Sequence, residues 1–249
     1  MYKSEGKATT SNMYADTKTW NPFVGCRFQC IYCRVSFQRQ LKRWGKGNCR
    51  DCYDYAPHRH PERLNRIPSS RIVFCCGDGD IAFCDTDFLE AIMQAVSMHN
   101  RRSPYKTYYF QSKDWVSASR VIPFLEEYGL ENAVILETLE TNRDESYGSV
   151  SIAPRPTLRH KAFREVAYER KVVTVEPILD FDLDPFFRMI SEVEPEYVWI
   201  GYNSKPNLVR LPEPSLEKTI TLIRLLEASG IQVKTKDLRS ALSGERPVA

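Results

Sequence analysis

Short strand-like runs alternate with helix-patterned runs along most of this 249-residue chain. An alternation repeated about six times implies a parallel sheet with right-handed crossovers, because each helix must carry the chain back to begin the next parallel strand. A TIM-like barrel and a doubly wound sheet both satisfy this pattern. The expected strands are 17–23, 71–76, 106–110, 133–138, 171–175, 197–201 and 232–235. The expected helices lie near 34–44, 85–100, 115–128, 158–168, 183–193 and 214–229.

One stretch, 45–68, breaks the alternation and is expected to be an insertion within a single domain of residues 16–238. The polar residues 1–15 predict a flexible N-terminal tail, and 239–249 predict a C-terminal tail. The sequence shows no apolar core of a signal peptide and no run near the roughly 18 apolar residues of a membrane span. We therefore expect a cytoplasmic protein that has no membrane partner.

All eight cysteines lie between residues 26 and 84, and without an export signal they favour metal binding over disulfides. Cys26, Cys30 and Cys33 follow the first strand with the spacing C-x₃-C-x₂-C, and Tyr32 stands directly before the third cysteine. Three thiolates this close together can wrap one face of a [4Fe–4S] cluster and leave one iron open, which is a catalytic feature. The alternatives are a structural zinc site, because zinc binds thiolates equally well, and free cysteines.

The cysteine motif resembles the signature of the radical S-adenosylmethionine (SAM) enzymes, C-x₃-C-x-aromatic-C after the first strand of a partial barrel. Cys26, Cys30, Tyr32 and Cys33 match it position by position. The wider sequence, with WNPFVGC, GDGDIAF, ETN and EPILDFD, is similar to archaeal and phage-borne members grouped near spore photoproduct lyase. The resemblance implies an α/β fold, a partial (β/α)₆-type TIM-like barrel of mostly parallel strands with a Cys/His-containing insertion.

The same resemblance implies the cofactors and the chemistry. The open iron of a [4Fe–4S] cluster on Cys26, Cys30 and Cys33 would bind the amino and carboxylate groups of SAM. A one-electron reductant such as ferredoxin or flavodoxin would supply the electron that cleaves SAM reductively. The resulting 5′-deoxyadenosyl radical would abstract hydrogen from a substrate. In this division of work the cofactors carry the difficult chemistry, while the protein orients the reactants and excludes water.

Polar residues follow nearly every expected strand, at the edge where parallel α/β folds place their active sites. By the resemblance, the turn at 77–80 faces the methionine part of SAM and the strand end at 137–142 faces its ribose. The expected cofactor-binding residues are Tyr32, Gly77, Asp78, Gly79, Asp80, Gln111, Lys113, Glu137, Thr138, Glu140, Asn142 and Glu176. A structural ion pair with Lys236 or Lys113 is the alternative role of Glu176, since a buried carboxylate needs a partner. The candidates for catalysis, by position alone, are Lys113, Tyr202, Asn203 and Lys236.

A second group of potential metal ligands lies in the insertion. Cys49 and Cys52 have C-x₂-C spacing, and with His58 and His60 they can supply four zinc ligands. One alternative is an auxiliary iron–sulfur cluster that Cys49 and Cys52 share with Cys75, Cys76 and Cys84. Another is that these cysteines are reduced and buried. The last is favoured for Cys75 and Cys76, because neighbours on a strand point to opposite faces.

The formal net charge is only +3, but the positive charge is concentrated. Ten Lys and Arg against three Asp and Glu give residues 34–72 a net charge of +7. The aromatic residues Phe37, Trp44, Tyr53 and Tyr55 are interleaved with these cations. This combination is typical of nucleic-acid binding, because aromatic rings stack on bases and Lys and Arg neutralise phosphates. For the charge alone, a solvent-exposed helix face is the alternative. Residues that could extend the same face are Arg155, Arg159, His160 and Arg164.

Three functions therefore follow from the sequence. The first is a radical SAM enzyme that modifies or repairs nucleic acid. The second is a radical SAM enzyme for a small metabolite or a peptide, which the acidic remainder of the chain fits. The third is a non-catalytic zinc-binding interaction module, which would contain zinc and no iron.

Overall fold

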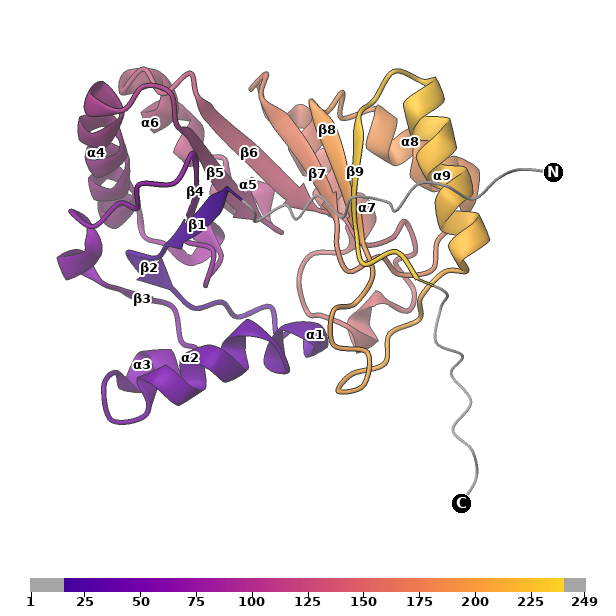
Figure 1. Ribbon diagram of the computed structural model, residues 1–249, viewed down its shortest axis with the longest axis horizontal. Coiled ribbons are helices and arrows are strands. Elements are labelled where there is room, and N and C mark those ends of the chain that lie inside the picture. Colours follow the sequence, from indigo (N-terminus) through magenta and orange to yellow (C-terminus); the bar gives the residue numbers. More distant parts are fainter. Residues whose placement is uncertain (1–15, 240–249) are drawn as a thin grey trace.

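The computed structural model describes residues 16–239. Seven strands form one parallel sheet in which neighbours in space are also successive in the chain, so that the sheet curls into a half-barrel (Figure 1). The fold expected from the strand–helix alternation, a partial TIM-like barrel, is confirmed. In order across the sheet the strands are β1 (Thr17–Trp20), β4 (Ile72–Cys75), β5 (Thr107–Ser112), β6 (Ala133–Thr138), β7 (Lys171–Val175), β8 (Tyr197–Gly201) and β9 (Val233–Lys236).

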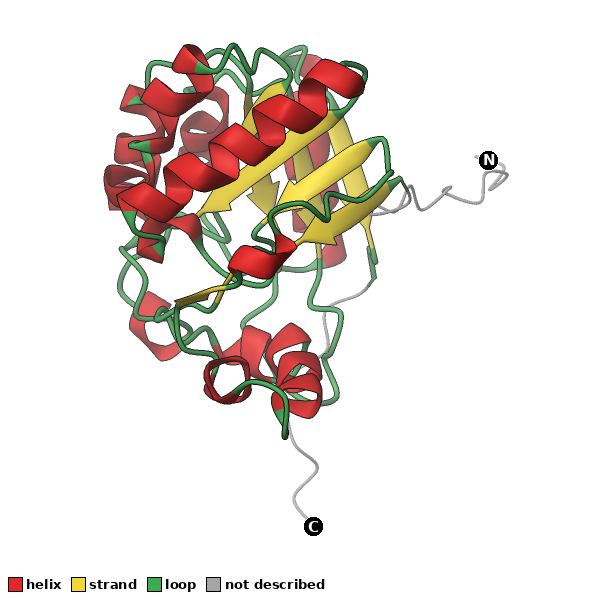
Figure 2. Ribbon diagram, turned by 90° about the vertical axis from the view of Figure 1, so that its left-hand side faces the viewer, coloured by secondary structure: helices red, strands yellow, loops and turns green. Residues whose placement is uncertain are grey.

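Helices cover the outer face of the sheet (Figure 2). Between them and the strands lies the main apolar core, which includes Ile135 and Val173 from the outward-facing positions of two neighbouring strands. The inward-facing positions make a smaller cluster that includes Leu136 and Val172. The helices that follow the strands are α4 (Thr86–Arg102), α5 (Trp115–Ala118), α6 (Val121–Glu127), α7 (Pro156–Glu165), α8 (Leu183–Ser191) and α9 (Leu216–Ala228).

Two expected elements are divided in the structure. The run 17–23 forms β1 and then a separate strand, β2 (Phe23–Val24), because Asn21 and Pro22 interrupt it and a proline cannot donate to a sheet ladder. The helix expected at 115–128 is split into α5 and α6 between Ala118 and Val121. Both divisions lie within stretches whose overall type the sequence predicted.

The expected insertion, 45–68, and the helices α1 and α2 that precede it form a compact unit below the sheet in Figure 1. The antiparallel pairing of its short strand with β2 attaches this unit to the segment that enters the cysteine motif. Its helical side consists of α2 and α3, which pack against each other where Gly45 meets the backbone of Cys52 and Tyr53. The elements of this region are α1 (Ile31–Arg34), α2 (Phe37–Gly45), α3 (Arg50–Asp54), β3 (His58–Arg59) and η1 (Pro61–Arg63).

The structure describes little of the two tails expected from the sequence. The N-terminal tail expected at 1–15 lies outside the described residues, and Arg239 is the one described residue of the C-terminal tail. Arg239 is paired with Glu213 at 2.7 Å.

Of the helices between residues 16 and 239, none combines the length and hydropathy of a membrane span.

Candidate active site

The cysteine motif is held against the end of β4 by two glycines. Gly25 donates its backbone N–H to the Asp78 carbonyl at 3.1 Å, and the Asp80 N–H donates to the Gly25 carbonyl at 3.2 Å. Gly25 has φ of 100°, and a Cβ there would lie 2.1 Å from the Ala56 carbonyl oxygen. A Cβ on Gly79 would lie 2.9 Å from the carbonyl oxygen of Gly25. This close approach therefore requires glycine on both sides.

Cys26, Cys30 and Cys33 all line one cavity of about 720 Å³ at the carboxyl ends of the strands. Strand ends form one wall of this cavity, and α2 together with Tyr55 forms another. The expected site residues that line it are Tyr32, Gly77, Asp78, Gly79, Asp80, Gln111, Lys113, Thr138, Glu176, Tyr202, Asn203 and Lys236. The strand-end rule therefore located the cavity correctly.

Cys30 is buried, whereas Cys26 and Cys33 are partly exposed to the cavity. Cys30 is 4% exposed, and its Sγ lies 3.2 Å from the Ser151 hydroxyl. A hydrogen bond from Cys33 and the nearby cation of Lys113 lower the pKa of Cys30. Burial and the charge of Asp80 raise the pKa of Cys26. Cys30 is thus the thiol of the motif that this environment favours as thiolate.

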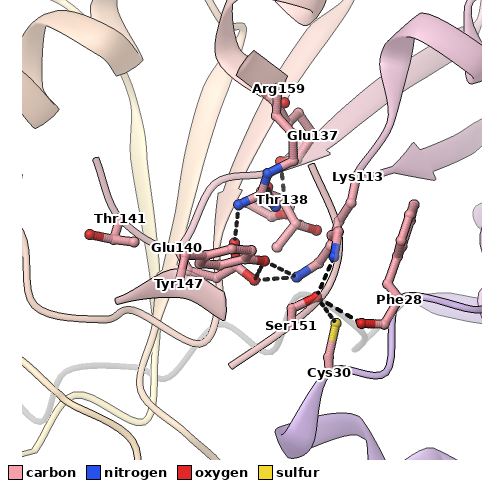
Figure 3. A network of polar contacts seen from close by, with 12 residues as sticks. Phe28, Cys30, Lys113, Glu137, Thr138, Glu140, Thr141, Tyr147, Ser151 and Arg159 are labelled. Atoms are coloured by element: carbon pink, nitrogen blue, oxygen red, sulfur yellow. Dashed lines mark hydrogen bonds and ion pairs between the residues drawn. The ribbon is translucent and has the colours of Figure 1, made fainter. Parts of the chain in front are cut away.

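A buried polar network lies directly behind the cysteines (Figure 3). Glu140 is fully buried and accepts hydrogen bonds from Arg159 at 2.8 Å and from Tyr147 at 3.0 Å. It also forms an ion pair with Lys113, whose ammonium group contacts the hydroxyl of Tyr32. The aromatic residue of the motif therefore connects the cysteine loop to this network, donating to Glu140 at 2.5 Å.

Two buried glutamates of this region, Glu137 and Glu140, differ in their ionisation state at neutral pH. Burial alone would raise the pKa of Glu140, but Arg159 and Lys113 outweigh it and lower that pKa to about 2. Burial raises the pKa of Glu137 to about 8. Among the described residues, neither carboxyl oxygen of Glu137 has a hydrogen-bond partner. Glu140 is therefore a carboxylate at neutral pH, whereas Glu137 is mostly protonated.

Three expected cofactor residues do not line the cavity. Thr138 of β6 faces the cavity. Its neighbour Glu137 therefore faces outward, toward α7, because successive residues of a strand point to opposite faces of the sheet. Glu140 lies behind Tyr32, and Asn142 bonds Asp182 at the outside. Thr138 is thus the only one of the four expected residues at 137–142 that reaches the cavity.

The acidic turn after β4 makes internal bonds. Asp80 accepts from the Ser112 hydroxyl at 2.6 Å and from the N–H groups of Lys113 and Ala82, both at 3.0 Å. Burial nevertheless raises its pKa to about 6. Asp78 accepts from the Asn21 amide at 2.7 Å. These bonds hold the turn against β5 and β1.

The remaining polar strand ends also have partners. Lys236 pairs with Glu176 at 2.7 Å, which confirms the structural partner considered from the sequence, and Trp199 donates to the same carboxylate at 2.9 Å. The Tyr202 hydroxyl lies 2.8 Å from that of Thr219, and the Asn203 amide donates to the Val209 carbonyl at 2.7 Å. Gln111 donates to the Thr138 and Thr174 hydroxyls.

The second expected cluster is assembled in the structure. The ligand atoms of Cys49, Cys52, His58 and His60 all lie within 4.8 Å of one another. The competing partnership with the other three cysteines is not formed, because these are buried in the main core away from the insertion. They are Cys75, Cys76 and Cys84.

The basic face is smaller than the sequence indicated. Arg159 is only 1% exposed and points inward, because the Thr138 carbonyl and the Glu140 carboxylate bind its guanidinium. His160 is buried and contacts Glu192. Their expected role on a nucleic-acid surface is therefore wrong. Arg155 and Arg164 are exposed.

Two residues of the site were not expected from the sequence. Tyr147 and Ser151 come from a loop after β6 that has no strand-end signal. Arg39 and Arg43 belong to the basic segment 34–72, and the structure places both on α2, one turn apart, in the lining of the cavity.

Neither a protein-family model nor a curated protein matches the sequence. Solved structures do match the fold. The chain superposes on Streptococcus suis SuiB bound to precursor peptide SuiA with a TM-score of 0.56 and 10% identity, covering 89% of this chain and 48% of SuiB. It superposes on spore photoproduct lyase complexed with dinucleoside spore photoproduct with a TM-score of 0.56 and 13% identity, covering 87% of this chain and 75% of the lyase.

These matches define the fold class. The chain shares the fold of spore photoproduct lyase and of SuiB, and it spans about half the length of the SuiB chain. The fold implied by the resemblance to radical SAM enzymes near spore photoproduct lyase is confirmed.

Proposed function

We propose that this protein is a radical SAM enzyme with a [4Fe–4S] cluster on Cys26, Cys30 and Cys33. One observation carries the proposal. These three are the only cysteines among the described residues that line the cavity at the carboxyl ends of the half-barrel. Three thiolate ligands leave one iron without a protein ligand, facing about 720 Å³ of space. That volume is in the range of cofactor and substrate sites.

The donor set fits the group. Thiolates are the ligands that iron–sulfur clusters select, and the three sulfurs share one cavity wall. Lys113 is 8% exposed and places a cation near Cys30, which compensates part of the negative charge of a thiolate-ligated cluster. When bound, the cluster and SAM supply a 5′-deoxyadenosyl radical that can abstract hydrogen from a substrate.

The chain's own residues orient and enclose the reactants. The Gly25–Gly79 contact fixes the loop that carries the cysteines. Thr138 and Gln111 present hydroxyl and amide groups at the inner wall, where ribose hydroxyls of SAM can be bound. The turn at 77–80 lines the side of the cavity next to the cysteine loop, within reach of the methionine part. Deeper inside the half-barrel, away from the carboxyl ends of the strands, an apolar layer that includes Tyr109 and Tyr197 excludes water.

Anaerobic purification followed by iron, sulfide and zinc analysis tests the chemistry. After addition of dithionite and SAM, we expect about four irons per chain and formation of 5′-deoxyadenosine. Both should be lost in Cys30→Ala and kept in the control Cys75→Ala, which removes a thiol from the core instead of the cavity. Zinc without iron, together with no SAM cleavage, would make the protein a zinc-binding interaction module and refute the proposal. In the cell, a ferredoxin or flavodoxin would replace dithionite.

We further propose that the substrate is a nucleic acid, bound where α2 faces the cavity. Arg39 and Arg43 line the cavity and, between residues 16 and 239, take part in no ion pair. Beside them, Phe37 and Tyr55 pack with ring centroids 5.8 Å apart and also line the cavity. Unpaired arginines bind phosphates and aromatic rings stack on bases. The similar lyase is complexed with a dinucleoside, which agrees with this assignment.

A peptide is the second candidate substrate, because SuiB has the same fold and is bound to a precursor peptide. The two are separated by measuring 5′-deoxyadenosine formation with oligonucleotides and with peptides under otherwise equal conditions. A nucleic-acid substrate should raise turnover above the uncoupled background with DNA or RNA only. Stimulation by peptides or by small metabolites alone would contradict it.

A further inference from the structure

The ligand atoms of the four potential metal-binding residues in the insertion lie close together. The Nε2 atom of His58 lies 3.5 Å from Cys49 Sγ and 3.2 Å from Cys52 Sγ. The Nε2 atom of His60 lies 3.2 Å from Cys52 Sγ and 2.8 Å from His58 Nε2. A tetrahedral zinc with ordinary Zn–S and Zn–N bonds has ligand–ligand edges of about 3.3–3.8 Å. These four edges are somewhat shorter than those of the tetrahedron, and the other two are no longer than 4.8 Å, so the four atoms surround a space of about the right size for one zinc ion.

The outer nitrogens of both histidines are already bound. His58 Nδ1 lies 2.7 Å from the Ala56 carbonyl oxygen, and His60 Nδ1 lies 2.8 Å from a Glu62 carboxylate oxygen. Both oxygens only accept hydrogen bonds, so each Nδ1 carries a proton. The two Nε2 atoms therefore point toward each other across 2.8 Å, inside the group of four. Histidine ligands of metals are commonly oriented in this way, with the outer ring nitrogen donating to a carbonyl or carboxylate oxygen.

The set of donors selects the metal. Two thiolates and two neutral imidazoles are a common structural zinc set, and they neutralise a divalent ion completely. A [4Fe–4S] cluster takes its ligands on separate irons around a whole cubane, which is too large for four donor atoms within 4.8 Å. Cys52 is fully buried and His60 is 7% exposed, so the site is closed to solvent on one side. A closed site with four protein ligands is structural.

We propose that Cys49, Cys52, His58 and His60 bind one zinc ion that joins α3 to β3 within the insertion, next to the cysteine loop. Cys49 and Cys52 belong to the α3 side of the insertion, whereas His58 lies on β3, opposite Val24 of β2. The next residue after Val24 is Gly25, where the cysteine loop begins. The ion therefore joins α3, which packs against α2, to the strand that pairs with the base of the loop that carries Cys26. It does so whether or not the cavity performs radical SAM chemistry.

The triple variant Cys26→Ala/Cys30→Ala/Cys33→Ala isolates this site, because it lacks the ligands of the proposed iron–sulfur cluster. We expect about one zinc per chain to remain in it. X-ray absorption at the zinc edge should give two sulfurs near 2.3 Å and two nitrogens at about 2.0–2.1 Å. Retention of iron in the triple variant, absence of bound metal, or zinc with only oxygen and nitrogen ligands would each overturn the proposal.

Single substitutions identify the ligands. Cys52→Ser should lose the zinc, whereas the control Cys84→Ser, a buried cysteine in the main core, should keep it. His60→Cys retains four ligands and should bind zinc with three sulfurs and one nitrogen, which keeps the test valid if Cys52→Ser does not fold. Unchanged ligand shells in His60→Cys would show that His60 does not bind the metal and would overturn the four-ligand site.

Discussion

Lys113 and Glu140 form a buried ion pair in the wall of the cavity, immediately behind the cysteine loop. Glu140 also binds Arg159, so one carboxylate compensates two buried cations. Tyr32 contacts both members of the pair through its hydroxyl. The network therefore has an excess positive charge, located on the side of Cys30.

Glu140→Gln should strongly destabilise the protein, because it leaves Lys113 and Arg159 buried without their carboxylate. Removing one partner of a buried ion pair typically costs about 3–5 kcal/mol. Urea unfolding of the anaerobic protein measures this loss. The exposed Glu145→Gln is the matched control and should change stability by less than about 0.5 kcal/mol. Equal stability of the two variants would contradict the network.

Gly25→Ala should disrupt the cysteine loop. The added Cβ would lie 2.1 Å from the Ala56 carbonyl oxygen, so the loop or β3 must move. The control is Gly47→Ala, which also has positive φ, 81°, but nothing within 4 Å of the added atom. Gly47→Ala should cost about 1 kcal/mol from backbone conformation alone. Gly25→Ala should cost clearly more and lower the iron content, and similar effects of both variants would show that the close approach is unimportant.

The sequence predicted the sheet well, because β6 and β8 are buried on both faces and read as continuous apolar runs. Strand-end position was a sufficient guide to the cavity but not to each side chain. Glu137 and Thr138 are adjacent, and the face each occupies depends on the register of β6, which composition alone does not reveal. The burial of Arg159 is a second feature that the sequence did not predict. An arginine on a helix is expected to be exposed, and its burial depends on Glu140, which is distant in sequence.

Stability should fall as pH rises from about 5 to 8, in part because of Glu137. Its pKa is raised to about 8 in the folded protein from an ordinary value of 4.5. Between these values the unfolded chain loses a proton that the folded protein keeps, so stability decreases by at most about 1.4 kcal/mol per pH unit. Glu137→Gln should reduce this slope, whereas the exposed Glu127→Gln should keep it. Thermal unfolding at several pH values measures the slopes, and parallel curves for Glu137→Gln and the unmodified protein would contradict the assignment.

Glu140 should give the opposite dependence at acid pH. Its pKa is lowered to about 2, so the stability it contributes is complete above its ordinary value of 4.5 and is lost as pH falls through 2. In acid titrations the unmodified protein should therefore converge toward the lower stability of Glu140→Gln. A constant difference between the two down to pH 2 would show that the carboxylate charge is not what stabilises the network.

Arg39→Ala/Arg43→Ala should weaken single-stranded nucleic-acid binding and also its dependence on salt. Each phosphate contact contributes about 0.7 to the slope of log K against log salt concentration, so two lost contacts should reduce the slope by about 1.4. The control is Arg101→Ala/Arg102→Ala, which removes two exposed arginines from the end of α4, at the opposite edge of the sheet from the cavity. Fluorescence anisotropy of a labelled oligonucleotide over a range of salt concentrations gives both slopes. An equal reduction in the two double variants would indicate only a general charge effect, and it would refute the cavity arginines as a phosphate site.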